Sequence, residues 1–436
     1  MQDISTILDI LPRIARRYLF YLRSQRWSRK QLEAYQDRKL RELILHAARH
    51  VPYYRKLFEE IGLQQESFRG RADVHRIPLL DKETFRRRTE EFIADNAKRF
   101  RPEWQKTSGS TGTPIKFMLS ADSRANDAAA IIRTYQWAGY YPGKRIFTVR
   151  GFPDANWEFK YNLLGTSLNF NSVKLTKDSA LRVLKEINKL KPEVYCGYPF
   201  CLIMISKIAH DEKVEIPLGR YIIVTGETTS ENNRKVLENT YGGKVFDVYG
   251  MTENAVMIAE CEYVNKHVID DFAYHEFVDD KGNILEAEGK GEIVGTSYYN
   301  YAMPLIRYKT RDYVTLKPHD EICKCGRTFR MVQQIEGRED DFIKTPDGKL
   351  LRMIHLALTL GKGIVGSQYV QDTLDHMYVN IVPGPDFEKD SLKEVEKHLH
   401  MRLGNFIRID FKIVSELEKT RLGKTPFIIS KIGLRL

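Results

Sequence analysis

Apolar residues recur three and four positions apart over residues 7–22, and arginines stand between them. This spacing predicts an amphipathic helix near the start of the chain. The pattern repeats over residues 38–50 and predicts a second helix, which should end at Val51 because a residue before proline avoids the helical region. For the first helix two interpretations remain open. The basic helix of residues 1–30 either packs on the protein body with its arginines in water or rests on an anionic membrane surface.

Further along the chain, helix-like and strand-like runs alternate. The expected helices cover residues 123–140, 179–190, 200–210 and 231–241, and the expected strands cover residues 145–149, 193–196, 220–224 and 244–248. Such alternation predicts an α/β fold in which helices cover a parallel sheet. The strand ends of such a sheet meet at one ligand-binding edge, where the residues that follow the strands should project.

From residue 291 onward the chain is rich in β-like segments. Strands are expected over residues 292–296, 313–316 and 331–336, and then over 368–372, 377–381 and 410–414, with one helix over 391–403. The Gly337-Arg338 pair between the two groups is typical of a domain boundary. We therefore expect a large N-terminal domain of residues 1–339 and a small, mobile α+β C-terminal domain of residues 340–436.

Composition narrows the class of protein. A chain of 436 residues is long enough for about two domains. Lys and Arg outnumber Asp and Glu by 69 to 58, an excess that suits an anionic partner, and a nucleotide is sufficient without nucleic acid. No apolar run is long enough to span a bilayer and no secretory signal is evident, so a cytoplasmic protein is expected. The five clustered cysteines do not resemble a disulfide framework.

Residues 107–113 are all Gly, Ser or Thr. Backbone N–H groups and hydroxyls of such a loop can surround a polyphosphate. The loop is not a P-loop of the Walker type, because Gly112 is followed by Thr113-Pro114 instead of a lysine. On its own it would be interpreted as a flexible linker.

Four further stretches of the sequence indicate a function for the glycine-rich loop. They are Tyr-Gly-Met-Thr-Glu at 249–253, Arg-Tyr-Lys-Thr-Arg-Asp at 307–312, Gly-Arg-Glu-Asp-Asp at 337–341 and Lys-Thr-Arg-Leu-Gly-Lys at 419–424. Together with the loop they resemble, in the same order, the motifs of the adenylate-forming enzymes, which include acyl-CoA synthetases, amino-acid adenylating domains and luciferases. Residues 304–308 and 323–328 look most like the phenylacetate-CoA ligase branch, which includes capsular-polysaccharide-associated proteins.

The resemblance implies an ATP-dependent ligase. Such an enzyme adenylates a small-molecule carboxylate with ATP and Mg²⁺, releases pyrophosphate and passes the acyl group to CoA or to an amine or hydroxyl of a glycan. This chemistry depends mostly on alignment and charge neutralisation. The residues that the resemblance assigns to ATP are Thr107, Ser108, Gly109, Ser110, Thr111, Gly112, Gly226, Glu227, Asp247, Tyr249, Gly250 and Asp312.

The resemblance also implies individual roles. Tyr249 would stack on the adenine, which Gly226-Glu227 would line, and Asp247 would accept a hydrogen bond from its amino group. Asp312 would accept both ribose hydroxyls, a role that suits a carboxylate.

The resemblance assigns catalytic roles to three further residues. Thr252 would contact the α-phosphate, Glu253 would bind Mg²⁺ and Arg338 would reach the phosphates.

The last two implied roles involve the C-terminal domain. Asp340 would be the hinge of this domain. Lys424 would bridge the carboxylate and the α-phosphate, because a lysine on a mobile domain can arrive at the reaction and leave again. Arg311 stands where most adenylate-forming enzymes have glycine.

Cys261, His267, Cys323 and Cys325 form a separate group within residues 261–325. Three cysteines and one histidine are a closed ligand set for a structural Zn²⁺. The alternative is two unrelated pairs of free thiols.

Two more questions remain open at this stage. The aromatic residues Phe152, Trp157, Phe159 and Tyr161 either line an acyl pocket or belong to the core. The whole chain is either an active ligase or an inactive peripheral membrane or scaffold protein that keeps the fold. The joint presence of a magnesium ligand, a ribose-binding aspartate and a lysine at position 424 favours the ligase.

Overall fold

The structure is a computed structural model. It describes residues 4–106, 115–152, 154–227, 229–285, 288–318, 321–338, 342–346, 350–352, 361–403, 406–420 and 425–432. The glycine-rich loop from Thr107 to Gly112, the expected hinge Asp340 and Lys424 therefore lie outside the described residues. Of Arg338, only its place at the end of a strand is described.

The chain divides into two compact units. Unit 1 comprises Met1–Tyr141 and Val248–Glu336, and unit 2 comprises Pro142–Asp247 and Gly337–Leu436. The expected domain boundary between residues 339 and 340 falls outside the described residues and remains a prediction.

Unit 1 begins with helices. Its α-helices are α1 (Ile4–Ser24), α2 (Arg29–His50), α3 (Pro52–Glu60), α4 (Arg71–Val74), α5 (Lys82–Arg87) and α6 (Ala121–Trp137), and its 3₁₀ turns are η1 (Gln65–Ser67), η2 (Thr89–Phe92) and η3 (Ala97–Phe100). The second helix starts well before residue 38, because Ser28 and Gln31 form a capping box at its N-terminus. Both of the first two predicted helices are confirmed, and the second ends before Pro52 as expected.

The strands of unit 1 flank the glycine-rich loop and build a sheet. β1 (Glu103–Lys106) and β2 (Lys116–Leu119) form an antiparallel hairpin. The sheet has the order β11 (Ala273–Val278), β12 (Gly289–Ser297), β13 (Tyr308–Leu316), β14 (Met331–Arg338), β10 (Lys266–Val268), β9 (Met257–Glu260) and β8 (Lys244–Gly250). The predicted β-rich texture after residue 291 is confirmed.

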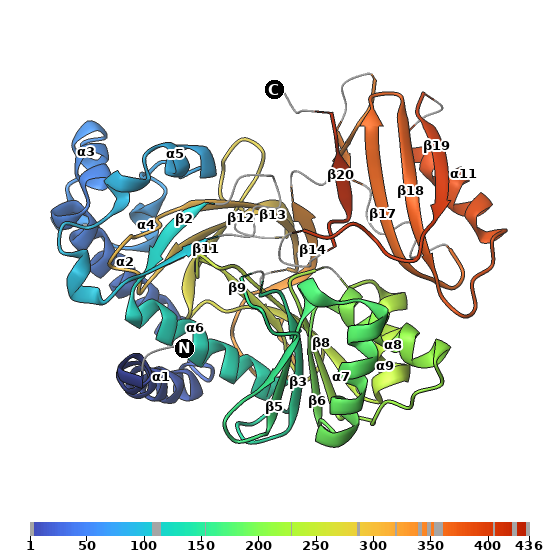
Figure 1. Cartoon of the computed structure of the whole chain (residues 1–436). Coiled ribbons are helices and arrows are strands. Elements are labelled where there is room, and N and C mark those ends of the chain that lie inside the picture. The colour runs from blue at the N-terminus through green and yellow to red at the C-terminus, as the bar shows by residue number, and fades with distance from the viewer. Residues whose placement is uncertain are drawn as a thin grey trace. The chain divides into compact units, whose positions relative to one another are not determined.

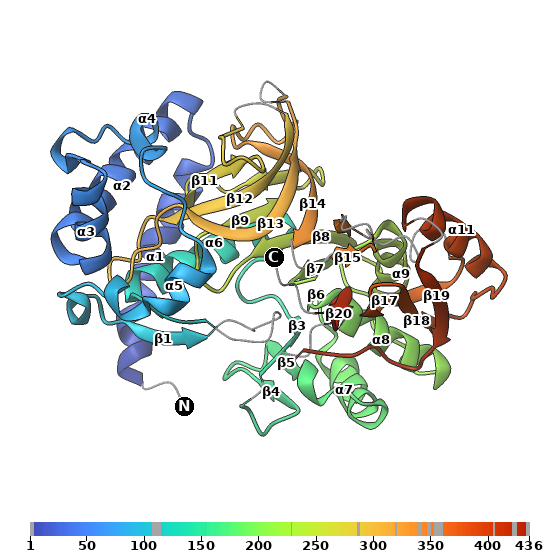
Figure 2. The same cartoon turned by 90° about the horizontal axis from the view of Figure 1, so that it is seen from above.

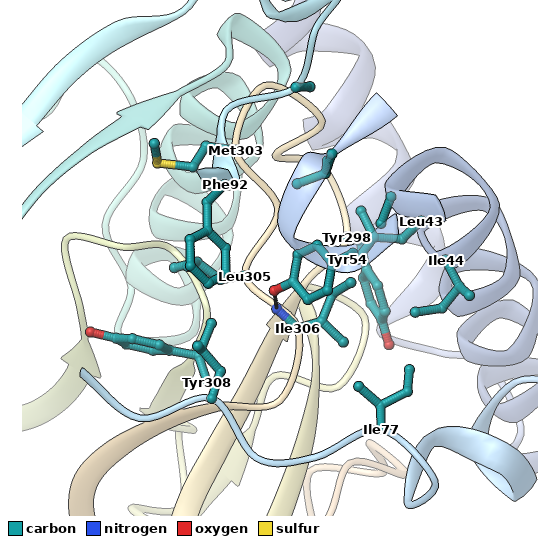
Figure 3. Packing of buried hydrophobic residues seen from close by; sticks show 14 of the residues in the cluster. Leu43, Ile44, Tyr54, Ile77, Phe92, Tyr298, Met303, Leu305, Ile306 and Tyr308 are labelled. Carbon is teal, nitrogen blue, oxygen red and sulfur yellow. Dashed lines mark hydrogen bonds between the residues drawn. The ribbon is translucent and has the colours of Figure 1, made fainter. Parts of the chain in front are cut away.

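An aromatic core joins the N-terminal helices to the segment before β13 (Figure 3). The hydroxyl of Tyr54, on α3, donates a hydrogen bond to the carbonyl oxygen of Pro304 at 3.2 Å and accepts one from the N–H of Ile306 at 3.0 Å. The side chains of Phe85 and Phe92 pack in the same cluster with Tyr308. This packing fixes the start of β13, the strand that carries Asp312.

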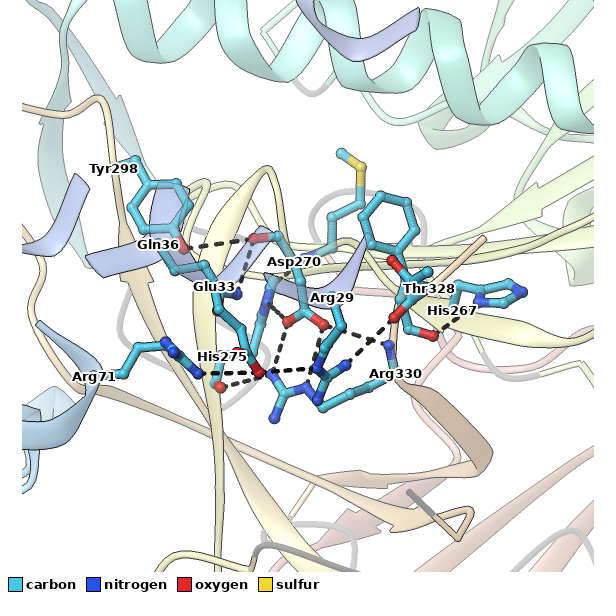
Figure 4. Close-up of polar contacts among 12 residues, drawn as sticks. Arg29, Glu33, Gln36, Arg71, His267, Asp270, His275, Tyr298, Thr328 and Arg330 are labelled. Atoms are coloured by element: carbon cyan, nitrogen blue, oxygen red, sulfur yellow. Dashed lines mark hydrogen bonds and ion pairs between the residues drawn. The ribbon is translucent and has the colours of Figure 1, made fainter. Parts of the chain in front are cut away.

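The interior of unit 1 also contains buried charged side chains that pair with one another (Figure 4). Asp270 accepts a hydrogen bond from Arg330 at 2.7 Å, and Nδ1 of His275 lies 3.3 Å from the same carboxylate. Burial alone would raise the pKa of Asp270, but Arg330 and His275 lower it well below its usual range. Arg133 of α6 pairs with Asp271 at 2.6 Å, and both side chains are fully buried. Burying any one of these charges without its partner would destabilise the folded state. The pair of Arg133 and Asp271 therefore holds α6 in its place on unit 1.

Unit 2 contains the parallel sheet that the alternating pattern predicts. Its strands have the order β7 (Tyr221–Thr225), β6 (Val194–Gly197), β3 (Ile146–Arg150), β5 (Ser167–Asn171) and β4 (Phe159–Tyr161). β7, β6, β3 and β5 are parallel, and β4 adds an antiparallel edge. The helices of this part are α7 (Lys177–Leu190), α8 (Pro199–Asp211) and α9 (Glu231–Tyr241), with the 3₁₀ turn η4 (Ser172–Lys174). The predicted α/β class is confirmed.

The C-terminal part of unit 2 is a small α+β module (Figures 1 and 2). A four-stranded sheet has the order β19 (Arg408–Ile413), β18 (His376–Pro383), β17 (Ile364–Thr373) and β20 (Ile428–Ser430), and α11 (Ser391–Leu403) packs on it. β15 (Phe342–Lys344) and β16 (Leu350–Arg352) pair separately. Val365, Val382 and Leu417 of this module share a hydrophobic cluster with Phe200 of α8.

Candidate nucleotide site and a cysteine–histidine cluster

Tyr249 and Asp312 meet in unit 1 although 63 residues separate them. Tyr249 is the penultimate residue of β8, and Asp312 lies within β13. The hydroxyl of Tyr249 donates a hydrogen bond to Oδ2 of Asp312 at 2.8 Å. Two residues that the resemblance assigns to the adenosine part of ATP are therefore in direct contact.

Arg311, next to Asp312, has an unusual backbone conformation. Its φ angle is +63°, in the left-handed region that side chains rarely adopt. Its N–H donates to Oε1 of Glu292 at 2.8 Å, which holds this conformation. The positive φ gives a physical reason for the glycine that most adenylate-forming enzymes have here. In this chain the hydrogen bond to Glu292 stabilises the positive φ angle of Arg311.

Glu253 follows β8 in a tight turn in which the N–H of Asn254 donates to the carbonyl of Met251 at 3.0 Å. The Glu253 side chain is only 4% exposed, whereas Thr252 beside it is exposed. Oε1 of Glu253 accepts a hydrogen bond from the hydroxyl of Tyr308 at 3.2 Å, and no cationic side chain of the described residues pairs with this carboxylate. A buried carboxylate with one neutral partner suits a divalent cation, and these residues therefore fit Mg²⁺.

Residues assigned to the nucleotide also lie in unit 2. Gly226 follows β7 and has a φ angle of +81°. The carboxylate of Glu227 accepts two backbone hydrogen bonds, one from Phe200 at the start of α8 at 3.2 Å and one from Thr425 at 2.8 Å. Asp247 is half-buried in β8. The contact of Glu227 with Thr425 was not expected from the sequence, where this residue was assigned only to the adenine.

Gln368 of β17 is a second functional candidate that the sequence did not indicate. It is fully buried, and its Nε2 donates to the carbonyl oxygens of Glu418 at 3.0 Å and Pro426 at 2.9 Å. Its Oε1 accepts from the N–H of Glu418 at 3.2 Å. One amide thus joins the segments on both sides of residues 421–424. A lone glutamine in a strand carries no sequence signal for such a role.

The aromatic residues of the expected acyl pocket divide into two groups. The rings of Phe152 and Trp157 lie 4.8 Å apart. Phe159 and Tyr161 of β4 pack against the hydrophobic cluster of unit 2. The last two therefore contribute to the core, and the acyl pocket remains a prediction.

The four predicted zinc ligands come together in unit 1. Cys261, His267, Cys323 and Cys325 are all buried, and their ligand atoms lie within 4.8 Å of one another. Sγ of Cys261 is 3.7 Å from Sγ of Cys323, and Sγ of Cys325 is 3.4 Å from Nε2 of His267. The described chain thus contains a Cys₃His arrangement of the kind that binds structural zinc.

The surroundings of this cluster orient its ligands. Nδ1 of His267 lies 3.4 Å from the carbonyl of Phe329, so it donates there and leaves Nε2 directed at the thiols. The N–H of Arg327 lies 3.5 Å from Sγ of Cys325, and Nδ2 of Asn265 lies 3.4 Å from Sγ of Cys323. A hydrogen bond with Cys261, together with His267, lowers the pKa of the Cys325 thiol below its usual range. A thiolate with N–H donors around it is the form that a metal ion requires.

Comparison with known proteins agrees with this geometry. Residues 104–300 match the AMP-binding enzyme family, and residues 343–431 match the CapK C-terminal domain. Protein CapK of Staphylococcus aureus is 22% identical over 91% of this chain and 89% of its own length. Phenylacetate-coenzyme A ligase of Thermus thermophilus is 28% identical over 72% of both chains.

Solved structures show the same fold. A crystal structure of 2-hydroxyisobutyryl-CoA ligase in its postadenylation state, with a bound adenylate, aligns with a TM-score of 0.75 at 21% sequence identity. The alignment covers 94% of this chain and 92% of the ligase. The likeness to the ligase structure shows the fold, and the two family matches together with the similarity to CapK and to phenylacetate-coenzyme A ligase place the chain in the phenylacetate-CoA ligase-like branch of the adenylate-forming enzymes, which includes CapK.

Proposed function

We propose that this enzyme uses ATP and Mg²⁺ to adenylate a carboxylic acid and then transfers the acyl group to an acceptor. In the first step a carboxylate oxygen attacks the α-phosphorus, the bond to the β-phosphate oxygen breaks and pyrophosphate leaves. In the second step the acceptor attacks the acyl carbon and AMP leaves. The observation that carries the proposal is the contact between Tyr249 and Asp312, with the buried carboxylate of Glu253 in the same unit.

Each of these residues has a defined task in the proposal. Asp312, ordered by the Tyr249 hydroxyl, accepts the ribose hydroxyls. Glu253, ordered by the Tyr308 hydroxyl, holds Mg²⁺, which neutralises phosphate charge when it is bound. Thr252, exposed beside Glu253, donates its hydroxyl to the α-phosphate. Lys424 stabilises the charge that develops there.

CoA is the preferred acceptor in this proposal, because the two ligases named above are both CoA ligases. Similarity to CapK over most of the chain supports a role in making a surface polysaccharide, with an amine or hydroxyl of a glycan as the alternative acceptor. The two possibilities separate in one assay. Pyrophosphate release that continues over many turnovers only when CoA is present indicates a CoA ligase.

We propose further that the Cys₃His cluster holds a structural Zn²⁺. All four ligands are buried, none of them is a residue assigned to ATP, and adenylation chemistry requires no soft metal. Zinc would join the turn around Cys261 to the turn around Cys323 and Cys325, which are distant in sequence.

The competing proposal is an inactive scaffold that keeps the fold. Such a protein has no use for a buried carboxylate that lacks a cationic partner in the part of the chain that the structure describes, since this group costs stability when nothing binds it. A screen of carboxylic acids for pyrophosphate release, with and without CoA, tests the choice. Release above the acid-free background supports the enzyme, and its absence across aliphatic, hydroxy and aromatic acids supports the scaffold.

A further inference from the structure

Helix α1 packs on unit 1 through one face. The hydroxyl of Tyr21 donates to Oδ1 of Asn126 on α6 at 2.7 Å, and the hydroxyl of Ser24 donates to the carboxylate of Asp271. The guanidinium of Arg17 lies 3.5 Å above the ring of Tyr299. In Figures 1 and 2 the helix runs alongside α6. The sequence-based interpretation of a helix packed on the body is thus correct for this face.

The opposite face of α1 is exposed along its length. The exposed positions among its described side chains fall on adjacent helical rows and are Leu11, Pro12, Ala15, Arg16, Leu19, Leu22 and Arg23. Leu11 is 53% exposed, Leu19 57% and Leu22 37%. Five of the seven positions are apolar and three of them are leucines, so the helix presents apolar side chains to the surroundings where a solvated helix would present polar ones.

The charged groups on this face are basic. Arg16 and Arg23 are exposed, and neither has an acidic partner among the described residues. The acidic residue in the described part of α1, Asp9, is occupied by Arg13 and Arg101. Arg16 also borders a surface hollow with Arg13 and Arg17, in which Asp9 and Asp122 are the acidic residues. The face therefore combines exposed leucines with unpaired positive charge.

We propose that this face of α1 docks the protein on an anionic lipid surface. Leucines of an interfacial helix insert at the boundary between headgroups and acyl chains, while arginines contact the anionic headgroups. A second copy of the chain fits less well, because a two-fold contact would set the arginines of both copies against each other. None of the described helices is both long and apolar enough to cross a bilayer.

The test uses substitutions on the exposed face and leaves the helix in place. Deletion of the helix would expose the partners of Tyr21 and Ser24 and confuse docking with unfolding. The variants are Arg16→Gln with Arg23→Gln, and Leu11→Ser with Leu19→Ser. The matched control is Lys185→Gln with Lys235→Gln, which removes two exposed charges from α7 and α9. Circular dichroism checks the fold of each protein.

Co-sedimentation with phosphatidylcholine vesicles, with and without phosphatidylglycerol, measures binding at low and high salt. The wild-type protein and the lysine control should bind the anionic vesicles at low salt and be released by high salt. The affinity of the arginine variant for the anionic vesicles should be at least about tenfold lower than that of the wild type. The affinity of the leucine variant should also be lower. Equal binding by all four proteins, or no wild-type binding at low salt, overturns the proposal. A dimer in sedimentation velocity that the leucine substitutions abolish, without vesicle binding, assigns the face to a second copy and also overturns it.

Discussion

The backbone N–H of Thr425 donates a hydrogen bond to Oε1 of Glu227 at 2.8 Å. The other oxygen of the same carboxylate accepts from the N–H of Phe200, the second residue of α8. Thr425 directly follows the proposed catalytic residue Lys424 in the sequence, so this hydrogen bond anchors the chain at the position next to it. We therefore expect Glu227 to act as a positioning residue for the proposed adenylation.

The substitution Glu227→Ala should lower the rate of adenylation about 10- to 100-fold, because misplacement of a catalytic group by about 1 Å has an effect of this size. The KM for ATP should change little. Pyrophosphate release at varied ATP concentrations measures both. Glu227→Gln, which keeps one acceptor oxygen, should have an intermediate rate. A large rise in KM with an unchanged maximal rate would instead assign Glu227 to the adenine, as the resemblance implies.

Purified protein should contain about one zinc ion per chain. The substitution Cys325→Ser should lower both the zinc content and the melting temperature, because the cluster joins two distant turns. Elemental analysis and thermal unfolding measure the two effects. Cys196→Ala, which alters a buried cysteine outside the cluster, should leave the zinc content unchanged. Metal-free protein with an unchanged melting temperature after Cys325→Ser would identify the residues as free thiols.

His275 should make unit 1 less stable in mild acid. Burial lowers the pKa of this histidine, and the neutral ring donates from Nδ1 to Asp270 and accepts from the N–H of Met257 at Nε2. The folded state thus binds fewer protons than the unfolded state. The contribution of His275 to the free energy of unfolding is fully present above the pKa of the unfolded state, about 6.5. It falls as the pH decreases below that value, by at most about 1.4 kcal/mol per pH unit.

Thermal unfolding at about pH 7.5 and about pH 5.5 measures this dependence. The His275→Gln variant has no titrating ring at this position. Its melting temperature should therefore decrease less between the two pH values than that of the wild type. Asp270 does not contribute in this range, because its pKa is lowered far below it. An identical loss in both proteins would assign the acid sensitivity to other groups.

Much of the fold follows from local sequence pattern. The alternation of runs between residues 145 and 248 reflects the two periodicities of helix and strand, and it predicted the parallel strands of unit 2. Element ends were less predictable, because they depend on capping. Ser28 and Gln31 begin α2 earlier than its apolar pattern does. The edge strand β4 is short and was read only as part of an aromatic segment.

Motifs in the sequence name part of the candidate site. Tyr249 and Asp312 were named from their stretches, and the structure brings them into contact. The cysteine–histidine cluster was also predicted from residue type alone. Gln368 and the contact of Glu227 with Thr425 were not predictable, because single polar residues acquire these roles only when distant segments pack together.

Pyrophosphate release by wild-type and Lys424→Ala protein, measured with the acid that the screen identifies, tests whether Lys424 serves the adenylation of a carboxylic acid. The Lys424→Ala protein should release pyrophosphate about 100-fold more slowly or worse, with ATP binding and the melting temperature retained. Lys412→Ala, which changes an exposed lysine in the same module, should behave as the wild type. Wild-type pyrophosphate release by the Lys424→Ala protein would contradict the account.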